Sequence, residues 1–191
     1  MNIIGKILPA AAFVLFMGLA LPLESAADNS TALKGTAAAP DALIAVGSPP
    51  VSFSLQSLEN QTVKLEDYLG KEAVLLVFWS FFCGPCREEI PEIDKLGKKY
   101  AGQGLEVLSI NVDGPKLEKP VRQHMTVNNF TFRVLWEEFD GPKLKTADSY
   151  GVGGTPTLVL IGKNGKVSWT LVGRDSQRDL ENQIRKALGF G

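Results

Sequence analysis

The residues of this sequence best suited to chemistry are its two cysteines, the only ones among 191 residues. Only Gly84 and Pro85 separate Cys83 from Cys86. Thiols at this spacing could cross-link the fold, bind a metal, stay inert or exchange electrons with another protein. The segments around them must decide among these possibilities.

The flanking segments predict that Cys83 lies at the start of a helix. Residues 73–78 (AVLLVF) form an apolar run without alternation, typical of a strand buried on both faces. After the cysteines, apolar residues recur at helical spacing through residue 100, and Pro85 suits a first helical turn. The helix dipole then favours the thiolate of Cys83, whereas Cys86 is one turn further in and is expected to be more buried.

This arrangement favours thiol–disulfide exchange over the alternatives. Cys83 would attack a partner disulfide, and Cys86 would then resolve the mixed disulfide. A zinc site needs about four ligands, and the only histidine, His124, is expected to be solvated on a surface helix. A structural disulfide that closes a two-residue loop would stabilise the fold very little.

The remaining pattern predicts one α/β domain. A parallel strand–helix–strand unit is expected from the buried run, the helix and a second strand at residues 105–112. The motif DGPKL occurs twice, at residues 113–117 and 140–144, and each copy is expected to begin a helix. The other expected elements are two short strands around a turn at Glu59–Asn60, a strand at 132–135, helices at 121–127, 143–150 and 175–188, and a hairpin of 157–161 with 166–172.

The N-terminal segment has the layout of a secretory signal peptide. One cation, Lys6, precedes an apolar stretch, and small residues follow up to Ala27, where cleavage is expected. The alternative is a retained anchor formed by residues 7–23. Residues 28–47 are rich in small residues and are expected to form a flexible linker, with the folded domain at 48–191.

These features predict an extracytoplasmic protein, periplasmic if the source is a Gram-negative bacterium. Membrane contact is expected only if residues 7–23 are retained. The net charge of −1 gives no indication of nucleic-acid binding. 

The segment FWSFFCGPC resembles the active site of the thioredoxin superfamily. The wider pattern resembles extracytoplasmic ResA/TlpA/DsbE-type thiol–disulfide oxidoreductases, through VSFSLQSLENQTVKLEDYLGK, the C-x-x-C-R-x-E-x-P run to Pro91, and YGVGGTPTLVLIGKNGK. The resemblance implies a thioredoxin-like three-layer fold: a central mixed sheet, helices on both faces and an N-terminal β-hairpin extension. It implies a redox-active Cys83–Cys86 disulfide, with no metal and no cofactor.

The resemblance also implies roles for residues around the cysteines. Pro156 matches the family's cis-proline, which faces the cysteine pair and leaves the Thr155 backbone free to bind an extended client. Glu89 matches a glutamate that could carry the proton of Cys86, and this matters more here because Val77 replaces the buried aspartate of thioredoxin. Further expected substrate contacts are Trp79, Phe82, Gly84 and Pro85.

The expected function is reduction of disulfides in client proteins such as apocytochrome c, with a membrane thiol reductase as electron donor. The Gly-Pro dipeptide supplies no histidine to stabilise a reduced thiolate, and strong oxidants depend on such stabilisation. A disulfide oxidase or isomerase, a thiol peroxidase and a metal chaperone remain alternatives.

Overall fold

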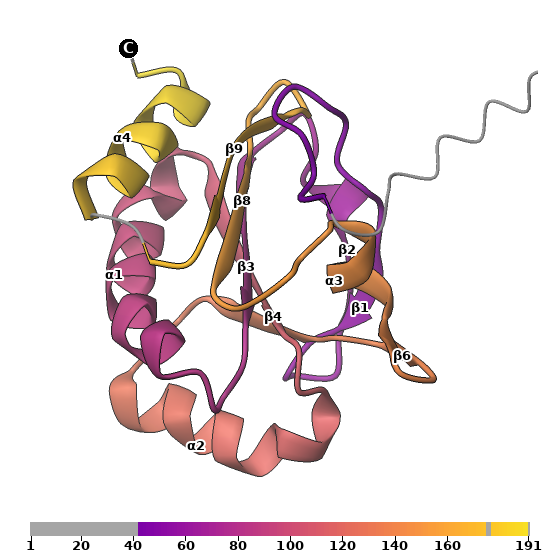
Figure 1. Cartoon of the computed structure of the whole chain (residues 1–191). Coiled ribbons are helices and arrows are strands. Elements are labelled where there is room, and N and C mark those ends of the chain that lie inside the picture. The colour runs from indigo at the N-terminus through magenta and orange to yellow at the C-terminus, as the bar shows by residue number, and fades with distance from the viewer. Residues whose placement is uncertain (1–41, 175–176, 191) are drawn as a thin grey trace, which may run out of the picture. The chain divides into compact units, whose positions relative to one another are not determined.

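A computed structural model of the chain describes residues 42–174 and 177–190 (Figure 1). The predicted signal peptide or anchor, and residues 28–41 of the predicted linker, lie outside the described residues. Within the described residues, no helix is both long and apolar enough to cross a membrane.

The centre of the fold is a five-stranded mixed sheet, as predicted. Its strand order is β5-β4-β3-β8-β9. The two pairings in the β5-β4-β3 part are parallel, and β8 is antiparallel to both β3 and β9. The strands are β3 (Ala73–Trp79), β4 (Leu105–Asn111), β5 (Arg133–Trp136), β8 (Thr157–Ile161) and β9 (Val167–Val172).

Helices cover both faces of this sheet (Figure 1). On one face lie α1 (Gly84–Tyr100), α2 (Glu118–Asn128) and α4 (Gln177–Leu188), whose apolar side chains form one core cluster. On the other face lie α3 (Lys145–Ser149) and a hairpin of β1 (Ser54–Gln56) and β2 (Thr62–Lys64). The predicted three-layer thioredoxin-like fold and its N-terminal hairpin are confirmed.

Strand β3 shows why the apolar run carries no alternation. All seven of its residues are buried. Leu75 and Val77 pack into the cluster beneath α1, whereas Leu76 and Phe78 pack into the cluster on the opposite face. A strand between two cores needs apolar side chains on both sides.

The two DGPKL copies adopt different structures. The first leads through a 3-10 turn (Pro115–Leu117) into α2, as predicted. The second forms a tight turn between β6 (Phe139–Asp140) and β7 (Lys143–Leu144), and α3 begins only at Lys145. The predicted helix start at the second copy is therefore wrong, because strand pairing across Gly141 replaces it.

The chain packs against the domain before the predicted boundary at residue 48. The Ile44 N–H donates to the Tyr150 carbonyl at 2.9 Å, and the Gly47 N–H donates to the Val167 carbonyl at 2.7 Å. Gly151 has a φ of +71°, and a Cβ there would collide with the Ala42 carbonyl. Residues 42–47, which were assigned to the linker, thus lie against the folded domain.

Candidate active site

The two cysteines form a disulfide where β3 leads into α1. Their Cα atoms are 5.2 Å apart. Cys83 caps the helix N-terminus, and its sulfur accepts a hydrogen bond from the Cys86 N–H at 3.1 Å. Cys83 is partly buried, whereas Cys86 is only 1% exposed. The predicted helix start and the difference in burial are both confirmed.

The loop before β8 brings a second predicted segment to the disulfide. The Thr155–Pro156 peptide bond is cis, as the resemblance implied. The Thr155 carbonyl oxygen lies 3.4 Å from the sulfur of Cys83. The pairing of β3 with β8 explains this approach, since it places the start of β8 beside the end of β3.

The two aromatic residues expected to contact substrate differ sharply in exposure. Phe82 is 74% exposed, next to the disulfide, while Trp79 is 0% exposed. The expectation that Trp79 contacts a client is therefore wrong, because its ring is sealed in the core under the site. Gly84 and Pro85 begin α1 and remain accessible, Gly84 in part and Pro85 fully.

The carboxylates of α1 lie in contrasting environments. Glu89 is only 8% exposed. It lies about one helical turn after Cys86 and faces inward, as Cys86 does. Glu88 is exposed and forms an ion pair with Arg174 in the loop after β9. We expect Glu88 to be a solvated surface charge. It is exposed, but it also has Arg174 as an ion-pair partner. Val77, in place of an aspartate, is buried in the cluster beneath α1.

His124 corrects another expectation. It lies on α2 but packs among aromatic rings, with centroids 6.0 Å from Phe81 and 6.4 Å from Trp79. Its Nδ1 lies 3.2 Å from the Asn128 side-chain nitrogen, whereas neither its Nε2 nor the Trp79 indole nitrogen has a hydrogen-bond partner among the described residues. Burial, and to a lesser degree the positive charge of Arg87, lowers the pKa of His124. His124 lies on a surface helix as expected, but it is half-buried rather than fully solvated, because α2 turns this face toward the cysteine loop.

Asp113 is a residue at the site that sequence reasoning missed. Its carboxylate accepts hydrogen bonds from the Phe81 N–H at 2.6 Å and the Ser80 hydroxyl at 2.8 Å. The Ser80 carbonyl in turn accepts from the Cys83 N–H at 3.1 Å. A signal existed, because Asp113 follows a strand parallel to β3, and the carboxyl ends of parallel strands meet at one edge.

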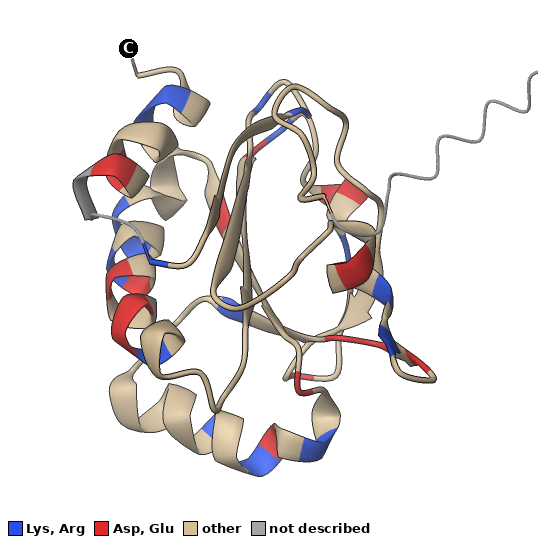
Figure 2. Cartoon of the chain, in the orientation of Figure 1, with Lys and Arg blue, Asp and Glu red and all other residues tan. Residues whose placement is uncertain are grey.

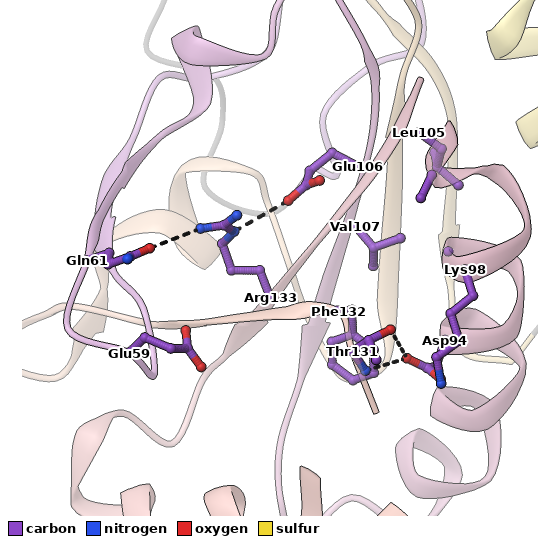
Figure 3. Close-up of a pocket in the computed structure, with 12 residues that line it drawn as sticks. Glu59, Gln61, Asp94, Lys98, Leu105, Glu106, Val107, Thr131, Phe132 and Arg133 are labelled. Carbon is purple, nitrogen blue, oxygen red and sulfur yellow. Dashed lines mark hydrogen bonds and ion pairs between the residues drawn. The ribbon is translucent and has the colours of Figure 1, made fainter. Parts of the chain in front are cut away.

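A separate pocket lies away from the cysteines, between α1, β4 and β5 (Figure 3). It has a volume of about 610 Å³. Four of its charged side chains form ion pairs: Arg133 binds Glu106, and Lys98 binds Asp94. Nowhere in the described part of the chain do three or more potential metal-binding side chains form a cluster.

Comparison with known proteins places this geometry in a family. Residues 46–170 match the model of the AhpC/TSA family. The chain belongs to that family. It is 37% identical over 141 residues to the thiol-disulfide oxidoreductase ResA of Geobacillus thermodenitrificans, covering 74% of this chain and 77% of that protein.

Solved structures agree with this assignment. The chain matches a crystal structure assigned as thiol:disulfide interchange protein DsbE from Chlorobium tepidum, with 34% identity and a TM-score of 0.67. The match covers 76% of this chain and 99% of the other. A second thiol:disulfide interchange protein, from Chlorobium tepidum TLS, matches with 25% identity and a TM-score of 0.65, over 78% of this chain and 100% of that one. The predicted membership among ResA- and DsbE-like thiol–disulfide oxidoreductases is confirmed.

Proposed function

We propose that this chain reduces disulfides in extracytoplasmic client proteins through a Cys83–Cys86 redox pair. The observation that carries the proposal is the disulfide itself, with a partly buried sulfur at the helix start and a buried sulfur behind it. A structural cross-link of this spacing would contribute little stability, and the cysteines of a thiol–disulfide oxidoreductase family are expected to react.

The reaction begins from the dithiol form of the pair. The Cys83 thiolate attacks one sulfur of a client disulfide, which forms a mixed disulfide and releases one client thiolate. The Cys86 thiolate then attacks the Cys83 sulfur and releases the second client thiolate. The client gains two electrons, and the protein ends as the disulfide that the structure describes.

The surroundings of the pair suit these two steps. The helix N-terminus and the Cys86 N–H stabilise negative charge on the Cys83 sulfur. The Thr155 backbone lies beside that sulfur and would pair with an extended client segment. Phe82 is an exposed apolar contact next to it. Glu89, buried near Cys86, would take or supply the proton of the resolving thiol.

The site and the resemblance support a proposal for the direction of the reaction and for its partners. The Gly-Pro dipeptide favours a reductase, with apocytochrome c as a client and a membrane thiol reductase that restores the dithiol form. We expect a midpoint potential nearer that of thioredoxin, roughly −270 mV, than that of DsbA, roughly −120 mV. A glutathione titration that places the couple above about −170 mV would reverse the direction to oxidase.

Trapping tests the roles of the two cysteines. Cys86→Ala should accumulate mixed disulfides on Cys83, because the resolving thiol is absent, whereas Cys83→Ala should abolish exchange. Mass spectrometry of the trapped species identifies the clients. Faster alkylation of Cys86 than of Cys83 in the reduced protein would contradict the assignment. Rapid turnover of hydrogen peroxide without a disulfide client would indicate a thiol peroxidase instead.

A further inference from the structure

A small pocket lies beside the cysteine loop, between that loop and α2. It has a volume of about 250 Å³. Phe81, which forms one wall, lies two residues before Cys83 and contacts the exposed Phe82 ring edge-on. The lining residues are Phe81, Pro120, Gln123, His124, Val127 and Asn128.

The pocket is lined by uncharged residues, of which Phe81, Pro120 and Val127 are apolar and Gln123, His124 and Asn128 are polar. Neither residues 80–83 nor the half of α2 that follows Arg122 carries a Lys, Arg, Asp or Glu (Figure 2). The lowered pKa of His124 keeps its ring neutral near pH 7. Among the lining residues, Val127 is 70% exposed, and Phe82, whose ring contacts Phe81, is 74% exposed. Such side chains, placed together beside a reactive site, suit an apolar ligand rather than an ion.

The volume sets the size of that ligand. Cofactor and drug-sized sites typically measure about 300–1,000 Å³, so this pocket suits a single side chain. The occupant must also come within reach of Cys83, because the Phe81 wall belongs to the loop that carries this cysteine. The pocket beside α1, β4 and β5 includes no residue of the cysteine loop, and four of its charged side chains are already in ion pairs.

We propose that this pocket, formed by Phe81 and α2, binds an aliphatic or aromatic side chain adjacent to the reacting cysteine of the client. The inference rests on the proposed function and adds a client preference to it. Val127 and the exposed Phe82 contact the bound side chain, and the uncharged His124 ring packs against it. Client segments with an acidic or basic residue at that position lose this contact and must desolvate a charge.

Peptides with one internal disulfide test the proposal in single-turnover reactions with the reduced protein. In matched peptides, the residue next to each cysteine is Ala, Leu, Phe, Asp or Lys. We expect second-order rate constants roughly tenfold higher for Leu and Phe than for Ala, since partial burial of one apolar side chain is worth about this factor. Asp and Lys peptides should react no faster than the Ala peptide.

Val127→Glu tests the position of the contact. It places a charge at the rim, and the ratio of Leu to Ala rate constants should fall below about twofold. Val46→Glu is the matched control, because Val46 is 61% exposed in the segment before β1, next to Gly47, which bonds to Val167 at the start of β9, and it should keep the full ratio. Equal rates for Leu, Ala and Lys peptides with the wild type, or equal ratios in both variants, would overturn the inference.

Reduction of a small aromatic disulfide by the wild type separates this inference from the function on which it rests. If the reduced protein leaves both that compound and the peptides unreduced, the proposed function fails. If it reduces them all without preference, only the pocket assignment fails.

Discussion

Asp113→Asn should loosen the loop that carries Cys83. The Asp113 carboxylate accepts the Phe81 N–H at 2.6 Å and the Ser80 hydroxyl at 2.8 Å, with one oxygen for each. Asparagine keeps the shape but has one acceptor oxygen, which can keep the Phe81 N–H while its NH₂ group faces the Ser80 hydroxyl. The change therefore removes the charge that strengthens the bond to Phe81 and forces the Ser80 hydroxyl to turn from donor to acceptor.

The structure sets the size of the effect. A hydrogen bond to a charged group contributes about 1.5–3 kcal/mol, more than a neutral one, and both bonds of this side chain lose the charge. We expect the free energy of unfolding of the disulfide form to fall by about 2 kcal/mol. The exchange rate of Cys83 should fall as well, because the Cys83 N–H is bonded to the Ser80 carbonyl that this loop positions.

Urea unfolding of the oxidised protein measures the change in stability, and stopped-flow reduction of a peptide disulfide measures the rate. Asp148→Asn is the control. Asp148 is also an aspartate that accepts a backbone N–H, from Leu144 at 3.1 Å, but it is exposed, so a loss within about 0.5 kcal/mol is expected. If both variants lost the same small amount, Asp113 would not hold the loop.

Two further predictions concern titratable groups near the cysteines. Glu89→Gln should slow resolution of the mixed disulfide by about 10²–10⁴-fold if Glu89 carries the proton, while the exposed Glu88→Gln stays within about twofold of wild type; equal pH–rate profiles for the two variants would remove that role. The folded-state pKa of His124 is lowered below its unfolded value of about 6.5, so the unfolded chain binds the proton more readily. Stability should therefore be lost as the pH falls from about 6.5 through the folded pKa. Because the chain has one histidine, His124→Gln should flatten this slope, and an unchanged slope in urea unfolding would contradict the assignment.

The elements of the fold could be predicted wherever a local pattern determines them. The run at residues 73–78 is apolar because both faces of β3 are buried, and the stripe of Ile90, Ile93 and Leu96 is the buried face of α1. The turn at Glu59–Asn60 also formed as predicted, with a positive φ at Asn60 that asparagine tolerates. In each case the pattern that identifies the element lies within a few consecutive residues.

The failures share a different property, which is dependence on residues outside the segment's own motif. The second DGPKL copy forms a hairpin because Phe139 pairs with Leu144, although its local composition matches the copy that begins α2. Residues 42–47 have the composition of a linker, yet they lie ordered on Tyr150 and Val167. The composition of a segment predicts its conformation in isolation. In the folded protein, hydrogen bonds to a neighbouring strand or carbonyl determine its conformation.

The same distinction separates the parts of the candidate site. The cysteines, the helix start and Pro156 belong to contiguous motifs, so sequence alone indicated their places. His124 and Asp113 are isolated polar residues whose positions depend on where α2 and the end of β4 meet the cysteine loop. The cysteines could thus be identified from the sequence. Asp113, which positions the cysteine loop, and His124, which lines its pocket, could be identified only once the packing of that loop, α2 and the end of β4 was known. The proposed client preference depends on the pocket residues, so it could be inferred from the structure but not from the cysteine motif alone.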